Sequence, residues 1–105
     1  YCASKFGLIG MVQSFAAETA KLGIRANVIC PGNVDTPMLN LLAEQISDRE
    51  DKPLEIVKQE LLDESFSGRL VSPEEVSRSC VWLCSDDASG ITGIALSVDA
   101  GMLLG

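Results

Sequence analysis

The stretch Ile24-Arg25-Ala26-Asn27-Val28-Ile29-Cys30 is a short run rich in apolar and β-branched residues, with Gly23 before it and Pro31 after it. Such a run predicts a mostly buried strand of a parallel sheet over residues 24–30. Residues 1–22 have a helical pattern of apolar side chains, and Gly23 is the residue type expected just past the end of a helix. A helix that leads directly into a buried strand is half of a βαβ unit, so the sequence predicts an α/β fold.

The segment after this strand, Pro31-Gly32-Asn33-Val34-Asp35-Thr36-Pro37, is a candidate ligand loop. Parallel sheets bind ligands at the carboxyl ends of their strands. Pro31 fixes the exit from the strand, Gly32 allows a close approach of the backbone, and Thr36 offers a hydroxyl. An ordinary turn between a strand and a helix is the alternative, but the position at the carboxyl end favours a ligand site.

Residues 38–68 carry two short amphipathic helical patterns, separated by a charged break at 47–52 and by Pro53. Long insertions between regular elements are usually functional or mobile, so this segment is predicted to be a lid. Its apolar side chains next to the ligand loop either line a substrate pocket or pack the lid onto the domain. The candidate pocket residues are Met38, Leu39 and Leu42, with Leu61 as a further candidate from the second helix.

Two later elements complete the expected order. Ser72-Pro73-Glu74-Glu75 matches a capping box with proline at the first helical position, which predicts a helix over 73–85. Residues 94–98 predict a last strand.

Tyr1 and Lys5 form the candidate catalytic pair, because residues four apart on a helix lie on one face with Cβ atoms about 5–6 Å apart. An ammonium group beside a phenol favours the phenolate and lowers the tyrosine pKa toward neutral pH, as general acid–base work requires. A chance pairing on a helix is the alternative. The same helix is apolar over much of its circumference, which predicts burial on more than one side, against its own domain or a second subunit.

Composition narrows the function classes. The 105 residues are 47% hydrophobic, with net charge −7 and no histidine, which predicts one domain at most. The acidic balance argues against nucleic acid and membrane partners, and no apolar run approaches the ~18 residues that span a bilayer. The start at Tyr1 shows no leader pattern, so no targeting peptide is expected. Cys2, Cys30, Cys80 and Cys84 form no metal pattern; Cys80 and Cys84 are expected to be buried free thiols of a cytoplasmic protein.

Several motifs together resemble the second half of a short-chain dehydrogenase/reductase, over essentially all 105 residues. They are Tyr1-x-x-x-Lys5, Arg25-Ala26-Asn27-Val28-Ile29-Cys30-Pro31-Gly32, Val34-x-Thr36, Gly68-Arg69, Ser72-Pro73-Glu74-Glu75-Val76, Leu83-Cys84-Ser85-Asp86, Ile91-Thr92-Gly93 and Val98-Asp99-Ala100-Gly101. The resemblance implies the C-terminal part of a doubly wound Rossmann-type parallel sheet, incomplete as given. It also implies an oxidoreductase that uses NAD or NADP and forms a homo-oligomer, a dimer or a tetramer.

The resemblance assigns roles by position. Tyr1 matches the tyrosine that exchanges a proton with the substrate, and Lys5 matches the lysine that assists it and binds the nicotinamide ribose. Pro31, Gly32, Val34 and Thr36 match the loop that contacts the nicotinamide. The substrate would be a small secondary alcohol or ketone, such as a 3-oxoacyl thioester, a hydroxy acid, or a sugar or ring alcohol.

Other features of the family pattern are absent. The chain has no GxGxxG, the family's catalytic serine and asparagine would precede Tyr1, and Ala100 replaces the middle glycine of the usual Asp-Gly-Gly. Asn27 matches a strand residue that is interpreted as structural. We therefore expect a fragment that is inactive alone, from a parent that is an enzyme. A lyase or isomerase relative and a non-catalytic assembly module are the alternatives.

Overall fold

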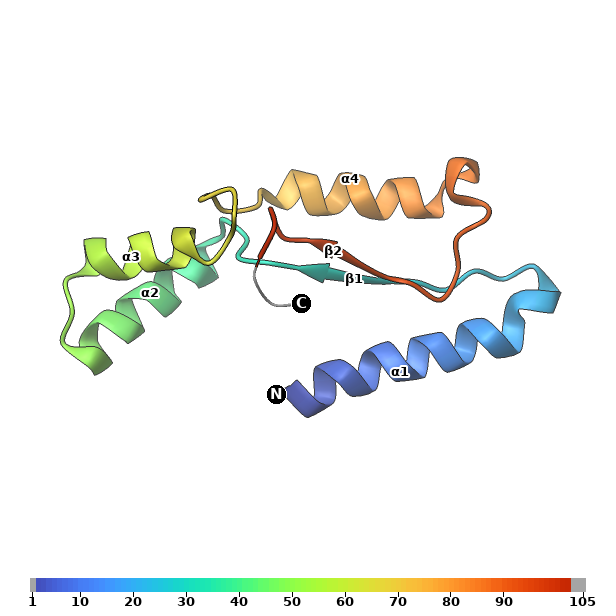
Figure 1. Cartoon of the computed structure of the whole chain (residues 1–105), viewed down its shortest axis with the longest axis horizontal. Coiled ribbons are helices and arrows are strands. Elements are labelled where there is room, and N and C mark those ends of the chain that lie inside the picture. Colours follow the sequence, from blue (N-terminus) through green and yellow to red (C-terminus); the bar gives the residue numbers. More distant parts are fainter. Residues whose placement is uncertain (1, 103–105) are drawn as a thin grey trace. The chain divides into compact units, whose positions relative to one another are not determined.

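The computed structural model describes residues 2–102 of the chain, which form an α/β fold with one α-helix before the first strand and three α-helices between the two strands (Figure 1). Within these residues β1 and β2 form a two-stranded sheet. The Val28 N–H donates to the Ile94 carbonyl at 2.9 Å, and four residues further on both strands the Gly32 N–H donates to the Val98 carbonyl at 3.1 Å. The strands therefore run parallel, as predicted. The elements are α1 (Cys2–Thr19), β1 (Val28–Pro31), α2 (Pro37–Glu50), α3 (Leu54–Asp63), α4 (Pro73–Cys84) and β2 (Ala95–Val98), with 3-10 turns at Ala20–Leu22 and Asp86–Ala88.

The chain divides into two compact units. The first contains the residues up to Cys30 together with Arg78–Ser97, and the second contains Pro31–Ser77 together with the residues from Val98 onward. Each unit thus combines segments from distant parts of the sequence.

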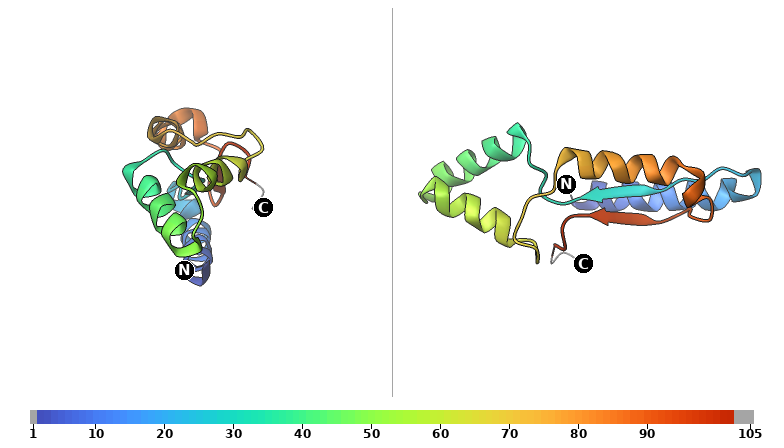
Figure 2. Two further views of the ribbon diagram at one scale, coloured as in Figure 1. Left: turned by 90° about the vertical axis from the view of Figure 1, so that its left-hand side faces the viewer. Right: turned by 90° about the horizontal axis from the view of Figure 1, so that it is seen from above.

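In the first unit, α1 and the final turns of α4 lie on opposite faces of the strand segments (Figures 1 and 2). The buried residues are Ala16, Val28, Leu83 and Ala88. The Gln13 side chain also donates to the Gly93 carbonyl at 3.1 Å, which ties α1 to the turn before β2.

The strand predicted over 24–30 begins only at Val28 and extends to Pro31. The residues before Val28 bond instead to the turn that precedes β2. The Ala26 N–H donates to the Thr92 hydroxyl at 3.1 Å, and the Asn27 side-chain oxygen accepts from the Ile94 N–H at 3.1 Å. The Gly93 N–H also donates to the Ala26 carbonyl at 2.8 Å, so side-chain and backbone bonds together join these segments before the regular strands begin.

The prediction that α1 is buried on more than one side against its own domain is wrong for the described part of the chain, whereas burial against a second subunit stays a prediction. Phe6 is 71% exposed, Met11 64% and Phe15 49%, whereas Ala16 is buried. The residues of the described helix that are not exposed form one stripe, which consists of Ile9, Val12, Ala16 and Thr19.

In the second unit, α2 and α3 fold back on each other as a helical hairpin (Figures 1 and 2). Ala43 from α2 and Val57 and Leu61 from α3 form its core, and Leu39, Ile46 and Leu54 pack around them. The charged break expected at 47–52 is shorter than predicted, since α2 continues to Glu50 and ends at Asp51, which has a left-handed backbone (φ 52°).

The capping box at the start of α4 is confirmed. The Glu75 N–H donates to the Ser72 hydroxyl at 3.1 Å, and the Ser72 N–H donates to the Glu75 carboxylate at 3.0 Å. Arg69 adds two bonds to the same carboxylate, at 2.8 and 2.9 Å. This charge-assisted pairing lowers the pKa of Glu75 to about 2, with the bond from the Ser72 backbone as the next cause.

Candidate functional site

The candidate ligand loop follows the carboxyl end of β1 and rests closely on the turn after β2. A Cβ atom on Gly32 would lie 2.6 Å from the Cβ and 2.8 Å from the Cα of Asp99, and 2.6 Å from the Met102 sulfur. Only glycine fits such a contact. The close approach expected at Gly32 is therefore an approach to the protein's own backbone, and it fixes where the loop starts.

The middle of the loop pairs with the segment that leads into α4. The Val71 N–H donates to the Asn33 carbonyl at 2.9 Å, and the Asp35 N–H donates to the Val71 carbonyl at 2.8 Å. Val34 and Val71 form a parallel bridge, and Val71 is 1% exposed. The backbone of residues 33–35 is thus fixed by hydrogen bonds to the buried residue Val71.

The Asn33 side chain makes a second attachment. Its amide nitrogen donates to the Leu61 carbonyl at 3.2 Å and to the Glu64 carboxylate at 2.6 Å. Both partners lie at the carboxyl end of α3. This role of Asn33 was not predicted from the sequence, because nothing near Asn33 in the chain indicates which distant helix end its side chain meets.

Thr36 begins α2 as its N-cap. Its hydroxyl accepts from the Leu39 N–H at 3.4 Å and donates to the Val34 carbonyl at 3.4 Å. These bonds orient the hydroxyl that the sequence analysis assigned to the cofactor.

Of the candidate catalytic pair, Tyr1 lies outside the described residues. Lys5 lies on α1 and its side chain is exposed. The catalytic roles of Tyr1 and Lys5 stay predictions.

The candidate substrate residues have two different environments. Met38 is 79% exposed and Leu42 is 43% exposed, whereas Leu39 packs against the core of the hairpin and Leu61 belongs to that core. Met38 and Leu42 thus offer apolar surface beside the loop, while Leu39 and Leu61 hold the hairpin together. Binding of substrate by any of these residues stays a prediction.

Comparison with known proteins places this geometry in a family. Residues 1–103 match the family model described as enoyl-(acyl carrier protein) reductase. The chain is 42% identical over 104 residues to dehydrogenase/reductase SDR family member 6 of Rattus norvegicus, covering 99% of this chain and 40% of that protein. The chain belongs to the short-chain dehydrogenase/reductase family. It spans about 40% of the length of the curated relatives that it matches.

Two further members of the short-chain dehydrogenase/reductase family extend the comparison. D-beta-hydroxybutyrate dehydrogenase of Cupriavidus necator is 38% identical over 102 residues, covering 96% of this chain and 40% of that protein. The crystal structure of actinorhodin polyketide ketoreductase with NADPH matches with a TM-score of 0.87 and 34% identity, covering 95% of this chain and 38% of that one. The predicted fold class, part of a Rossmann-type sheet, is confirmed.

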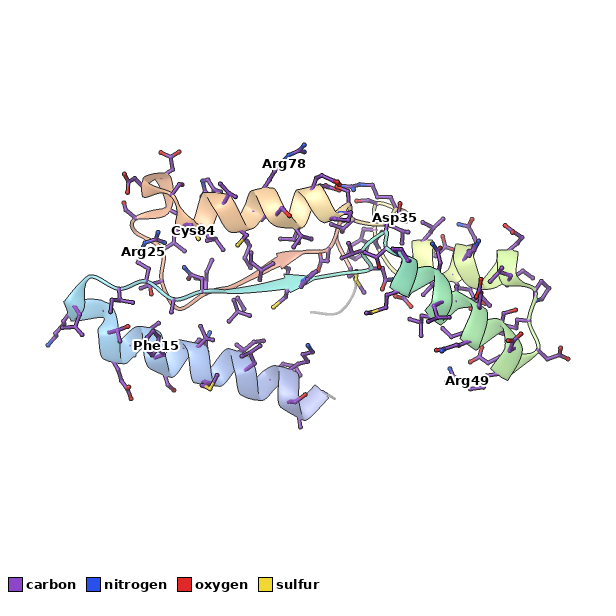
Figure 3. All side chains as sticks on the ribbon, turned by 180° about the vertical axis from the view of Figure 1, so that it is seen from behind. Phe15, Arg25, Asp35, Arg49, Arg78 and Cys84 are labelled. Atoms are coloured by element: carbon purple, nitrogen blue, oxygen red, sulfur yellow. The ribbon has the colours of Figure 1, made fainter. Side chains whose placement is uncertain are left out.

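This short-chain dehydrogenase/reductase chain also has an open hollow of about 500 Å³ in its first unit. Arg25, Asn27 and Ile29 line it together with Cys80 and Cys84, and Figure 3 shows Arg25 and Cys84 close to each other. The prediction that Cys80 and Cys84 are buried is wrong, since both are exposed free thiols. They follow the helical period of buried residues, but nothing described packs over them.

Arg25 is held by the structure itself. Its guanidinium donates to the Ile91 carbonyl at 3.2 Å and to the Ser85 carbonyl at 3.3 Å. This residue therefore links the start of β1 to the end of α4, a structural role.

Two other kinds of site are absent from the described part of the chain. Within residues 2–102, no three Cys, Asp or Glu side chains are grouped to hold a metal ion. None of the helices in this range has the length and apolar character that crossing a membrane requires.

Proposed function

We propose that the protein containing this chain is an NAD(P)-dependent oxidoreductase. It would transfer hydride between the nicotinamide and a secondary alcohol or ketone of the 3-oxoacyl or hydroxy-acid type. Residues 1–105 would form the C-terminal half of one Rossmann-type domain, with the catalytic helix at 1–22, the cofactor loop at 31–37 and the substrate lid at 38–68. The observation that carries the proposal is the firmly anchored loop at the carboxyl end of β1, in a chain of this family.

The donor set of this loop fits the nicotinamide end of the cofactor. A carboxamide has an acceptor oxygen and two N–H donors, so it needs partners of both kinds. Residues 32–36 carry main-chain N–H and C=O groups, and the Thr36 hydroxyl keeps one further lone pair as an acceptor beside its bonds to Val34 and Leu39. Pro31, Gly32, Val34 and Thr36 would hold this end of the cofactor, and Lys5 the ribose. When bound, the cofactor supplies or accepts the hydride.

Tyr1 and Lys5 would handle the proton. In the reductive direction the Tyr1 hydroxyl donates its proton to the substrate oxygen, and in the oxidative direction the phenolate takes that proton back. The Lys5 ammonium stabilises the phenolate in either direction. Such positioned acid–base groups contribute rate factors of about 10²–10⁴.

The relatives support the substrate class. One is named for D-beta-hydroxybutyrate and another is a polyketide ketoreductase with NADPH, so both names point to oxygen at a carbon near a carboxyl or acyl group. Met38, Leu39 and Leu42 would contact the apolar part of such a substrate. Substituting Met38 or Leu42 by Ala should then change KM across substrates of different size, whereas a change in thermal stability alone would favour lid packing.

We further propose a homo-oligomer, dimer or tetramer, in the cytoplasm. The exposed apolar side chains of Phe6, Met11 and Phe15 support a covering partner for α1. The free thiols of Cys30, Cys80 and Cys84 support a reducing compartment.

The test uses the full-length protein with NADH or NADPH, supplied with a 3-oxoacyl thioester or a hydroxy acid. Tyr1→Phe should lower kcat about 10²–10⁴-fold while nucleotide binding persists. Lys5→Met should lower both kcat and nucleotide affinity.

Lys21→Met is the matched control, because Lys21 is an exposed lysine in the turn after α1. It should leave turnover unchanged. Full turnover by Tyr1→Phe would contradict the proton role. Absence of nucleotide binding by the wild-type protein would favour the non-catalytic module, and nucleotide binding without redox turnover would favour a lyase or isomerase.

A further inference from the structure

The hairpin of α2 and α3 is a compact piece with its own core, attached to the candidate cofactor loop at both ends. At its start, Thr36 caps α2. At its end, the Asn33 amide holds the carboxyl end of α3. The four residues Asn33 to Thr36 therefore bear both attachments.

The bond to α3 has a clear physical basis. The last four carbonyl groups of a helix have no N–H partner inside the helix, and the Leu61 carbonyl is one of these in α3. Asn33 satisfies this group from outside the helix, at 3.2 Å. Its second bond, to Glu64 at 2.6 Å, is charge-assisted and therefore stronger than a neutral one.

Asn33 also lies between the residues assigned to the cofactor. Gly32 and Val34 flank it, and its own carbonyl accepts from the buried Val71 backbone at 2.9 Å. One residue thus connects the backbone of the loop to the end of α3.

We propose that Asn33 is a positioning residue that couples the cofactor loop to the hairpin of α2 and α3. Binding of the nucleotide to residues 31–36 then orders the hairpin through the Asn33 side chain. The inference rests on the proposed function, since it takes the loop to be the nicotinamide site and the hairpin to be the lid. Coupling energies of this kind change affinities about 5–150-fold.

Hydrogen exchange of the full-length protein, with and without saturating NADPH or NADH, tests the coupling. In the wild type, nucleotide should slow exchange in both 32–36 and 54–64. Asn33→Asp places a carboxylate against the Leu61 carbonyl and the Glu64 carboxylate. In this variant nucleotide should still slow hydrogen exchange in 32–36 as in the wild type. The factor by which nucleotide slows exchange in 54–64 should be about tenfold smaller than in the wild type.

Asn40→Asp is the matched control, an identical change at an exposed position of α2, and it should behave as the wild type. Asn33→Ala removes the donor without adding charge and gives the same comparison if Asn33→Asp does not fold. Combining Asn33→Asp with Glu64→Gln exchanges donor and acceptor, and it should restore part of the slowing in 54–64. General loss of stability would not produce this recovery.

The outcomes separate the two proposals. Nucleotide-dependent slowing in 54–64 that survives both Asn33→Asp and Asn33→Ala overturns the coupling while leaving the proposed function intact. Absence of any slowing in 32–36 of the wild-type protein contradicts the proposed function itself, and the coupling fails with it.

Discussion

Asn27 and Asn33 lie on either side of strand β1, yet their side chains bond to different kinds of partner. The Asn27 amide donates to the Ile91 carbonyl at 3.1 Å, and its oxygen accepts from the Ile94 N–H at 3.1 Å. Both partners are backbone groups of one neighbouring segment. Asn33 reaches instead to a helix end and to a carboxylate on a separate hairpin. The first arrangement fastens a sheet, whereas the second connects two parts that could move, and the same residue type serves both.

Among the substitutions considered around β1, Gly32→Ala, just after the carboxyl end of the strand, should lower the free energy of unfolding most. The added methyl group would overlap the backbone of Asp99, and such overpacking costs about 3 kcal/mol. Urea denaturation of the full-length protein should show this loss. Gly90→Ala is the control, because nothing lies within 4 Å of a Cβ there, and a loss of similar size in Gly90→Ala would contradict the explanation.

Asn27→Asp tests the other side of β1, where Asn27 directly precedes the strand. A carboxylate would face the Ile91 carbonyl without a donor between them, which should cost about 2 kcal/mol of unfolding free energy. Nucleotide-dependent exchange in 54–64 should stay as in the wild type. An exchange pattern like that expected for Asn33→Asp would mean that the two sides of β1 do not differ.

The turn on which Gly32 rests carries strain that can be relieved. Ala100 has φ 55°, a left-handed backbone that costs a residue with a Cβ about 1–2 kcal/mol. Ala100→Gly should therefore raise the unfolding free energy by about 1 kcal/mol, after the greater flexibility of glycine in the unfolded chain is subtracted. Ala17→Gly on the exposed side of α1 should lower it by about 1 kcal/mol instead. A lower melting temperature for Ala100→Gly would contradict the strain.

The smallest expected effect concerns Glu75, whose anchor is a surface ion pair. A carboxyl whose pKa is lowered by folding stabilises the protein above its unfolded pKa of about 4.3, and this contribution is lost as pH falls toward 2. The stability difference between wild type and Glu75→Gln should be largest near pH 7 and shrink on acidification. A constant difference from pH 7 to pH 3 would rule out the ion pair as its cause.

Local signals predicted the elements best. The capping box at Ser72 and Glu75 was readable because both partners lie within one helical turn. The structural interpretation of Asn27 agrees with its bonds to Ile91 and Ile94. The parallel strands and the helix–strand order likewise follow from hydrophobic pattern and bounding glycine and proline.

Features that depend on distant partners were not predictable. The role of Asn33 rests on residues about thirty positions further along the chain. Burial of Cys80 and Cys84 was predicted wrongly because helical period indicates a face, but not what lies opposite that face. The roles of Tyr1 and Lys5 rest on resemblance and stay predictions.

The interleaving of the two compact units has a consequence for folding during synthesis. Each unit is completed by chain that follows residue 77: Arg78–Ser97 in one, and the residues from Val98 onward in the other. Neither unit can complete its packing until β2 has left the ribosome, and α1 is without its partner segment during that time. Contacts between residues this far apart in the sequence slow folding, and they prolong the exposure of aggregation-prone apolar surface. Chaperone dependence should therefore rise for any variant that delays the pairing of β1 with β2.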